Sequence, residues 1–105
     1  MADTVESFFS TLQEKIDPKR TAGMNATFQF CISGESGGDW YVQFVDGAPT
    51  VRRGVAPESN IILTTSATDW LDIVNGKLNG QTAFLTGKLK LKGDLSLAMK
   101  LQSLL

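Results

Sequence analysis

The sequence has no histidine and only one cysteine, Cys31. Without histidine, neither a Ser-His-Asp triad nor a Cys-His nucleophile pair can form, and metal sites built on histidine are excluded. A single cysteine permits no internal disulfide and no cysteine-based metal site, and a free thiol is typical of a reducing compartment such as the cytosol. We therefore expect a cytoplasmic protein without a metal or other cofactor.

Targeting segments and long apolar runs are also missing. No basic-then-apolar leader opens the chain, and no apolar run approaches the roughly 18 residues of a membrane span. The glycine-rich stretch 34–39 lacks the spacing of a phosphate loop and is not followed by a helix pattern. Asp69 and Asp72 lie in the first turns of a predicted helix, where capping and the helix dipole account for them. These absences argue against an enzyme and leave open only a mechanism built on a lone carboxylate or tyrosine.

Charge is balanced overall but unevenly placed. The net charge of −1 argues against a dedicated nucleic-acid binder. Residues 1–76 carry five basic and ten acidic side chains, whereas residues 77–105 carry five lysines against Asp94 alone. The lysines are either the solvated face of a strand or a surface that docks on an anionic partner.

The length of 105 residues predicts one domain over residues 1–105. Asp3 and Glu6 have the spacing of a capping box at the start of an apolar helical stripe, and Asp17-Pro18 is expected to end that helix before a connecting loop. Alternating patterns predict strands over residues 26–33, 40–45, 50–53, 60–65 and 87–93, and helical patterns over 66–75, 80–85 and 95–102. We predict an α+β fold in which helices cover one face of a single sheet, with the third strand at its edge.

The helical pattern over residues 95–102 is apolar on nearly every side. A helix of this composition must be covered, either by the protein's own core or by a bound apolar ligand. Composition alone favours ordinary core, and another observation is required to favour a cavity wall.

Several ordered motifs supply that observation. They are Asp39-Trp40-Tyr41-Val42, Asn75-Gly76-Lys77-Leu78, residues 81–84, Gly87-Lys88-Leu89-Lys90 and Leu97-Ala98-Met99-Lys100-Leu101-Gln102. Together they resemble the sterol-carrier-protein type 2 family across essentially the whole chain. The resemblance implies a five-stranded, mixed and mostly antiparallel sheet in the order 3-2-1-4-5, with a hydrophobic tunnel between the sheet and the helices.

The resemblance also implies a function, namely non-catalytic binding and intracellular transfer of a fatty acid, fatty acyl-CoA, phospholipid or sterol-like lipid. The alternative is an accessory module that presents a lipid, such as a quinone precursor, to a partner enzyme. The residues expected to line the tunnel are Phe28, Phe30, Trp40, Phe44, Phe84, Met99 and Leu101. Polar anchors for a head group are expected among Gln102, Lys100, Arg52 and Arg53, and Met99 suits a wall that adapts to different ligands.

Two departures from the family pattern modify these expectations. Asn79-Gly80-Gln81 stands where the family often has proline before the glutamine, so a looser start is expected for the helix there. The sequence stops at Leu105, without the tail and peroxisomal signal of many eukaryotic members. From this we expect a compact prokaryotic cytosolic protein, a monomer, with an open tunnel mouth.

The first helix leaves a choice between a membrane interface and the sheet. Its polar face carries Glu6 and Glu14 against Lys15, which suits an anionic bilayer poorly. Packing on the sheet is therefore favoured, and transient membrane contact by another surface stays open.

Overall fold

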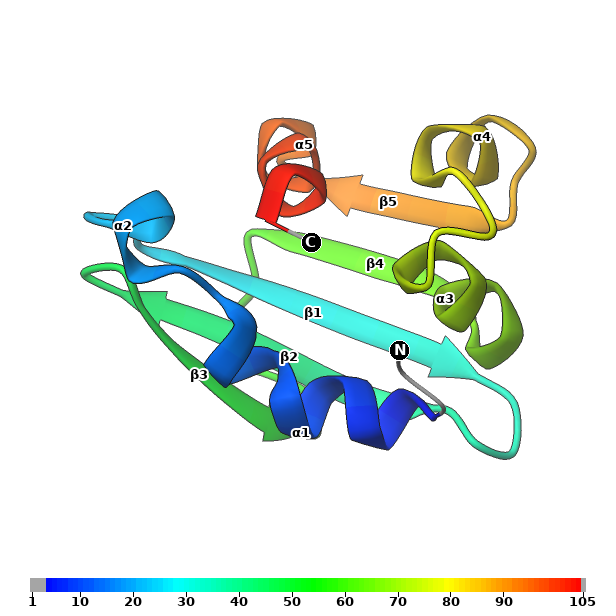
Figure 1. Ribbon diagram of the computed structural model, residues 1–105, viewed down its shortest axis with the longest axis horizontal. Helices are drawn as coiled ribbons and strands as arrows, with labels where there is room; N and C mark the ends of the chain where they lie inside the picture. Colours follow the sequence, from blue (N-terminus) through cyan, green and yellow to red (C-terminus); the bar gives the residue numbers. More distant parts are fainter. Residues whose placement is uncertain (1–3, 105) are drawn as a thin grey trace.

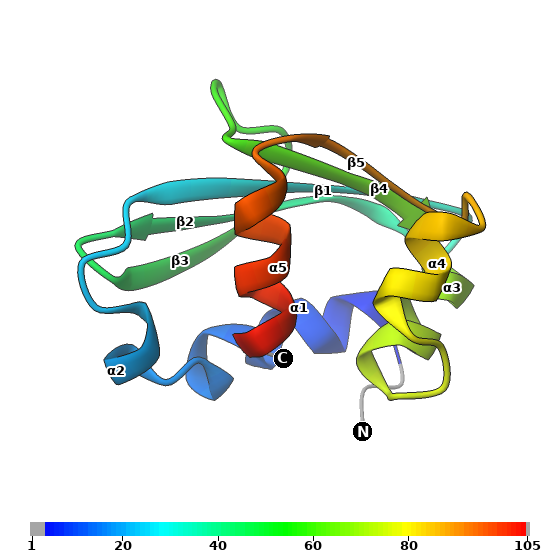
Figure 2. The ribbon, with the colours of Figure 1, turned by 90° about the horizontal axis from the view of Figure 1, so that it is seen from above.

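The computed structural model describes residues 4–104 and shows a five-stranded sheet with helices on one of its faces (Figure 1). The elements are α1 (Val5–Lys15), α2 (Pro18–Thr21), β1 (Ala26–Ser33), β2 (Gly38–Val45), β3 (Ala48–Arg53), β4 (Ile61–Ser66), α3 (Ala67–Val74), α4 (Gly80–Leu85), β5 (Leu89–Gly93) and α5 (Leu95–Leu104). The strand order is β3-β2-β1-β4-β5, as predicted, with β1 and β4 parallel and the other neighbours antiparallel. Figure 2 shows all five helices on the same side of the sheet.

The alternation of each strand decides which side chains face the helices. Phe28 and Phe30 of β1 pair with Ile61 and Leu63 of β4, and all four side chains are buried on the helix side. Gln29 points to the other face, where residues 54–60 cross from β3 to β4. Its side-chain amide donates to the carbonyl of Gly54 (3.1 Å) and accepts from the amide of Ala56 (2.8 Å). These bonds fix the crossover that makes β1 and β4 parallel.

The first helix begins and ends differently from the prediction. Thr4, and not Asp3, caps α1, because its hydroxyl accepts from the amide of Ser7 (3.0 Å) while the Ser7 hydroxyl accepts from the amide of Thr4 (3.1 Å). The proposed box with Glu6 is therefore wrong, and Asp3 itself lies outside the described residues. The predicted loop after Asp17 contains the short helix α2, since the fixed φ of proline suits a first helical position.

An aromatic core lies between α1 and the first three strands. Phe9 is 1% exposed, and its ring stacks on Trp40 (5.0 Å between centroids) and meets Phe30 edge-on (5.1 Å). Arg53 of the edge strand lies over the Trp40 ring at 4.7 Å and pairs with Glu6 of α1 at 3.2 Å. The apolar stripe of α1 is thus buried on the sheet, as the sequence favoured.

Caps position the helices of the second half. Ser66 accepts from the amide of Asp69 at the start of α3, and Asn79 accepts from the amides of Gln81 and Thr82 at the start of α4. Gly76 ends α3 with φ of 78°, a left-handed conformation that glycine adopts without strain. The side chain of Asp94 accepts from the amide of Ser96 (3.0 Å), as expected for the residue that starts α5.

Candidate functional site

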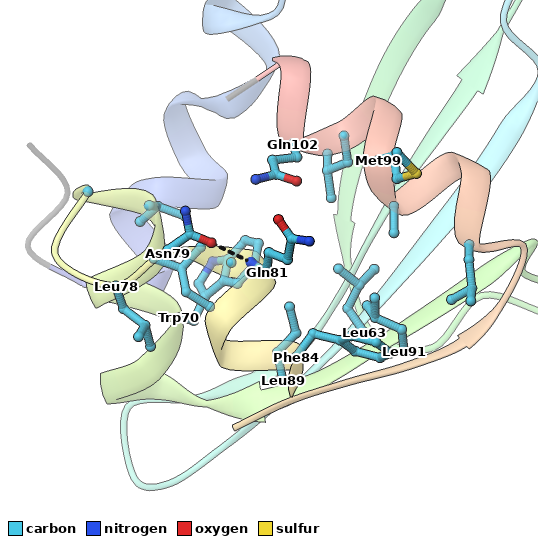
Figure 3. Close-up of a pocket in the computed structure, with 17 residues that line it drawn as sticks. Leu63, Trp70, Leu78, Asn79, Gln81, Phe84, Leu89, Leu91, Met99 and Gln102 are labelled. Carbon is cyan, nitrogen blue, oxygen red and sulfur yellow. Dashed lines mark hydrogen bonds between the residues drawn. The ribbon is translucent and has the colours of Figure 1, made fainter. Parts of the chain in front are cut away.

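An apolar pocket of about 650 Å³ lies between β4, β5 and the helices α3, α4 and α5 (Figure 3). Its lining comprises Leu63, Trp70, Ile73, Val74, Gly76, Leu78, Asn79, Gly80, Gln81, Phe84, Leu89, Leu91, Leu95, Ala98, Met99, Leu101 and Gln102. Its volume is within the range of roughly 300–1,000 Å³ that small-molecule pockets occupy. This is the site in which a ligand can be accommodated.

Leucines from two neighbouring strands form the sheet side of the pocket. Leu63 of β4 pairs with Leu91 of β5, and Leu89 lies two residues earlier on the same face of β5. The lysines that alternate with these leucines, Lys90 and Lys92, are exposed on the opposite face of the sheet. The alternation of lysine and leucine therefore separates a solvated face from a pocket floor.

The helices around the pocket are incompletely buried. Leu101 is the one buried residue among the described side chains of α5, whereas Leu95 is 51% exposed and Met99 is 73% exposed. Phe84 of α4 is also 41% exposed. The apolar terminal helix thus packs on the core through Leu101 and the partly buried Leu97, Ala98 and Leu104, while Leu95 and Met99 line an open pocket and stay exposed.

The polar groups of the pocket are uncharged. Asn79, Gln81 and Gln102 contribute carboxamides, and Trp70 contributes an indole. Trp70 is 2% exposed, and its Nε1 is buried without a hydrogen-bond partner in the described part of the chain. Among residues 4–104, no aspartate, glutamate, lysine or arginine lines the pocket, so the polar side chains found there are carboxamides and an indole.

The predicted lining residues separate into two groups. Phe84, Met99, Leu101 and Gln102 line the pocket, and Figure 3 shows Met99 and Gln102 projecting from α5 toward it. The second group is buried elsewhere on the helix side of the sheet and contributes nothing to the pocket lining: Phe28, Phe30, Trp40 and Phe44. Phe30 and Trp40 pack against Phe9 of α1, and Phe28 packs against Phe44, so these rings are part of the core.

The sequence also failed to single out residues that do line the pocket. Trp70 and the leucines of β4 and β5 were read only as part of the fold, although the lysine-leucine alternation of residues 88–92 marks which leucines face the helices. The charged head-group candidates Lys100, Arg52 and Arg53 are exposed and do not line the pocket. Gln102 is the candidate anchor that does.

The two groups with shifted pKa values, Cys31 and Asp94, do not line the pocket. Cys31 is on the other face of the sheet, where burial, and secondarily the charge and hydrogen bond of Asp39, raise the pKa of its thiol. Hydrogen bonds from Ser96 lower the pKa of Asp94 at the start of α5. Within residues 4–104, no three histidine, cysteine or acidic side chains are grouped closely enough to hold a metal ion, and no helix is long and apolar enough to cross a membrane.

A second cavity of about 470 Å³ lies on the face of the sheet opposite the helices. The crossover residues 56–60 and the side chains of Thr27, Tyr41 and Gln43 form it. About half of its lining is polar, and Glu58 carries a charge there, which makes it a poorer site for an apolar chain than the pocket beneath the helices.

The α+β sheet with helices on one face and an apolar, uncharged pocket beneath them defines a domain of the lipid-binding class. The chain belongs to the SCP-2 sterol transfer family, whose model matches residues 6–105. This confirms the resemblance drawn from the motifs and identifies the chain as a domain of a lipid-binding family.

Relatives with this domain differ in overall size. Hydroxysteroid dehydrogenase-like protein 2 of Danio rerio is 30% identical over 105 residues, which cover 99% of this chain and 25% of the relative. The chain therefore spans about a quarter of the length of that larger protein. Palmitated SCP2L2 from Aedes aegypti is 28% identical, with a TM-score of 0.79 over 95% of this chain and 92% of that one.

A more distant solved structure shares the fold alone. The ubiquinone synthesis protein UbiJ-SCP2 is 16% identical, with a TM-score of 0.63 over 90% of this chain and 76% of that one. Members of this fold thus occur both as small proteins and as parts of longer chains.

Proposed function

We propose that this protein binds a lipid in the pocket between β4, β5 and the helices α3 to α5, and carries it without chemical change. The observation that carries the proposal is the exposed apolar lining: Leu95 and Met99 are more than half exposed although they face a pocket. A bound alkyl chain would cover them, as the core covers the apolar side chains of α1. The candidate ligands are a fatty acid, fatty acyl-CoA, phospholipid or sterol-like lipid.

Burial of an alkyl chain is sufficient to drive this binding. Each methylene removed from water contributes about 0.8 kcal/mol, so ten contribute roughly 8 kcal/mol before the entropy of association is deducted. Micromolar affinity requires about 8 kcal/mol net, so with an association cost of about 4 kcal/mol a chain of about fifteen methylenes meets the requirement. Such a site needs apolar area and shape, and it needs no catalytic group.

Transfer requires contact with the membrane that donates or receives the lipid, and the rim of the pocket is the surface suited to it. Leu85 is 75% exposed beside the pocket residue Phe84, and Leu95 and Met99 add apolar area across the opening. Lys77 and Lys100 are exposed and each lies between two lining residues in the sequence, so they add positive charge near the rim, which favours an anionic bilayer. The apolar stripe of α1 is buried and cannot serve this purpose.

Direct binding of a fluorescent lipid tests the proposal. Delipidated protein should bind a pyrene-labelled fatty acid with micromolar affinity, and Ala98→Trp should weaken binding about tenfold or more by filling the pocket that Ala98 lines. Ala48→Trp is the matched control, since Ala48 is exposed on β3. Equal affinity in both variants, or protein that neither binds the probe nor carries lipid when native mass spectrometry is applied, would overturn the proposal.

A second function is favoured by the larger relatives. Because this domain forms a quarter of Hydroxysteroid dehydrogenase-like protein 2, it is suited to present a lipid, such as a quinone precursor, to an enzyme. Chemical crosslinking in the native host distinguishes the two: a specific enzyme partner whose turnover depends on the pocket supports presentation, and exchange between vesicles without a partner supports transfer. A cytoplasmic location, a monomeric state and a continuous tunnel stay predictions.

A further inference from the structure

The two edges of the sheet differ in how they are closed. At one edge, β3 contains Pro49, which has no backbone N–H to donate, and Arg53 of the same strand pairs with Glu6 of α1 at 3.2 Å. At the other edge, β5 contains no proline. Among the described residues, β4 is the one strand that pairs with β5. The edge at β5 is therefore the open one.

Backbone groups along this edge are available to another strand. In an edge strand, every second residue directs its N–H and C=O away from the neighbouring strand. Figure 1 shows α4 and α5 near the two ends of β5, and Figure 2 shows both helices beneath the sheet. Neither helix therefore occupies the plane of the sheet beyond β5.

The side chains of β5 have a different chemistry on each face. Lys90 and Lys92 are exposed on the face away from the helices, across from Thr64 and Ile62 of β4, which carry no charge. Neither lysine forms an ion pair with another described residue. Leu91 lies on the helix side, where it is partly buried and lines the pocket. An added strand would meet two positive charges on one face and apolar surface on the other.

We propose that the open edge of β5 is a docking site for an extended segment of a partner protein in which acidic and apolar residues alternate. Backbone hydrogen bonds to β5 would hold the segment as one more strand of the sheet. Its carboxylates would lie across from Lys90 and Lys92, where opposite charges on neighbouring strands attract. Its apolar side chains would point to the helix side and pack beside Leu91.

A second copy of this chain is poorly suited to the same edge. If two β5 strands paired antiparallel within one continuous sheet, lysines would lie across from lysines, and like charges at such positions are destabilising. Lysine on an edge strand is a known protection against pairing of this kind. The two side chains that exclude a copy, Lys90 and Lys92, would thus also select a segment of opposite charge.

Binding of short capped peptides to the full chain tests this inference. The probe is a fluorescein-labelled peptide of alternating valine and glutamate, used below its own aggregation concentration, and its counterpart alternates valine and lysine. We expect the lysine peptide to bind about tenfold more weakly than the glutamate peptide, because two cross-strand charge pairs change from attractive to repulsive. Fluorescence anisotropy measures both affinities.

Charge reversal on β5 sharpens the test. Lys90→Glu/Lys92→Glu should invert the preference, so that the lysine peptide binds about tenfold more tightly than the glutamate peptide. Lys15→Glu/Lys19→Glu is the matched control, since both lysines are exposed on α1 and α2, and it should keep the preference of the wild-type chain. Circular dichroism and urea unfolding verify that each variant is folded.

A peptide without backbone donors separates strand addition from simple attraction of charge. The glutamate peptide N-methylated at every residue keeps its carboxylates and loses its N–H groups, so the wild-type chain should no longer bind it measurably. Hydrogen exchange gives a second measurement, because backbone amides within residues 89–93 should become more protected when the unmethylated peptide is added.

Several outcomes would overturn the docking site. They are failure of the wild-type chain to bind the glutamate peptide, equal binding of the two peptides, and a preference that Lys90→Glu/Lys92→Glu leaves as it is in the control. Undiminished binding of the methylated peptide would also overturn it, by showing a surface that attracts any anion, an anionic membrane included. Because Lys90 and Lys92 face away from the pocket, none of these outcomes decides whether the chain binds lipid.

Discussion

The two halves of one sheet face are covered in opposite ways. Beneath α1, Phe9 stacks on Trp40 and meets Phe30, and every apolar side chain of that helix stripe is buried. Beneath α5, Leu101 is buried while Leu95 and Met99 remain more than half exposed. The half beneath α1 is packed like an ordinary core. The half beneath α5 leaves apolar side chains exposed beside a pocket. From this difference we expect stability to reside mainly in the half beneath α1 and, under the proposed function, ligand binding to occur in the half beneath α5.

The largest expected effect is a loss of stability when a residue in the half beneath α1 is changed. Phe9→Ala should lower the free energy of unfolding by about 3–5 kcal/mol, because it removes a ring that contacts three other aromatic rings of the core besides Phe8. Met99→Ala, at a residue 73% exposed, should lower it by less than about 1 kcal/mol. Urea unfolding measures both values, and similar losses would contradict the division.

A smaller effect is expected for membrane contact. Leu85→Glu places a negative charge beside the pocket rim and should reduce flotation with vesicles of phosphatidylcholine and phosphatidylglycerol about fivefold at low salt. Val55→Glu is the control, since Val55 is 68% exposed in the crossover on the other face. Added salt should weaken wild-type binding, because exposed charges are screened. Equal losses in the two variants would place the membrane contact elsewhere.

The smallest effect concerns Cys31, which lies outside both halves on the opposite face of the sheet. Burial and the nearby Asp39 carboxylate raise the pKa of the thiol, so the neutral thiol stabilises the fold below its unfolded pKa and this contribution is lost as pH rises through the raised value. Alkylation by iodoacetamide should therefore become fast only at higher pH than in urea-unfolded chain. Asp39→Asn should shift the profile slightly downward, and a saturating pocket ligand should leave it unchanged.

If the alkylation rate of Cys31 depended on pH in the same way in the folded and the unfolded chain, the raised pKa of the thiol would be contradicted. A profile that a pocket ligand displaces would instead show that the two faces of the sheet are coupled, against the division described above.

Much of the fold could be predicted because its signals are local. The alternation in β1 and β2, the Ser66 cap and the Gly76 stop each determine their element within a few residues. The capping box and α2 were missed at the chain start, where Thr4 competes with Asp3 and Pro18 can either end one helix or begin another. Both errors concern boundaries, which depend on single side-chain bonds.

The site was only half predictable, for a tertiary reason. Phe28, Phe30, Trp40 and Phe44 have the apolar character expected of a lining, but so does any core residue of a sheet. Which of them lines a cavity depends on where the helices lie, and these four residues are buried in the core away from the pocket. Met99 and Gln102 were proposed from the family motif and do line the pocket, whereas the spacing of apolar residues does not distinguish a pocket wall from core.

The most direct test of the central claim is a map of ligand-induced chemical shifts. Methyl and amide spectra of delipidated protein are recorded with increasing hexadecanoate, and the shifts are assigned to residues. We predict large changes for Leu63, Leu91, Met99 and Leu101 around the pocket, and small changes for Val5 and Leu12 of α1 and for Val42 of β2. Changes concentrated on α1 and β1 to β3, or spread evenly over both halves, would contradict the account.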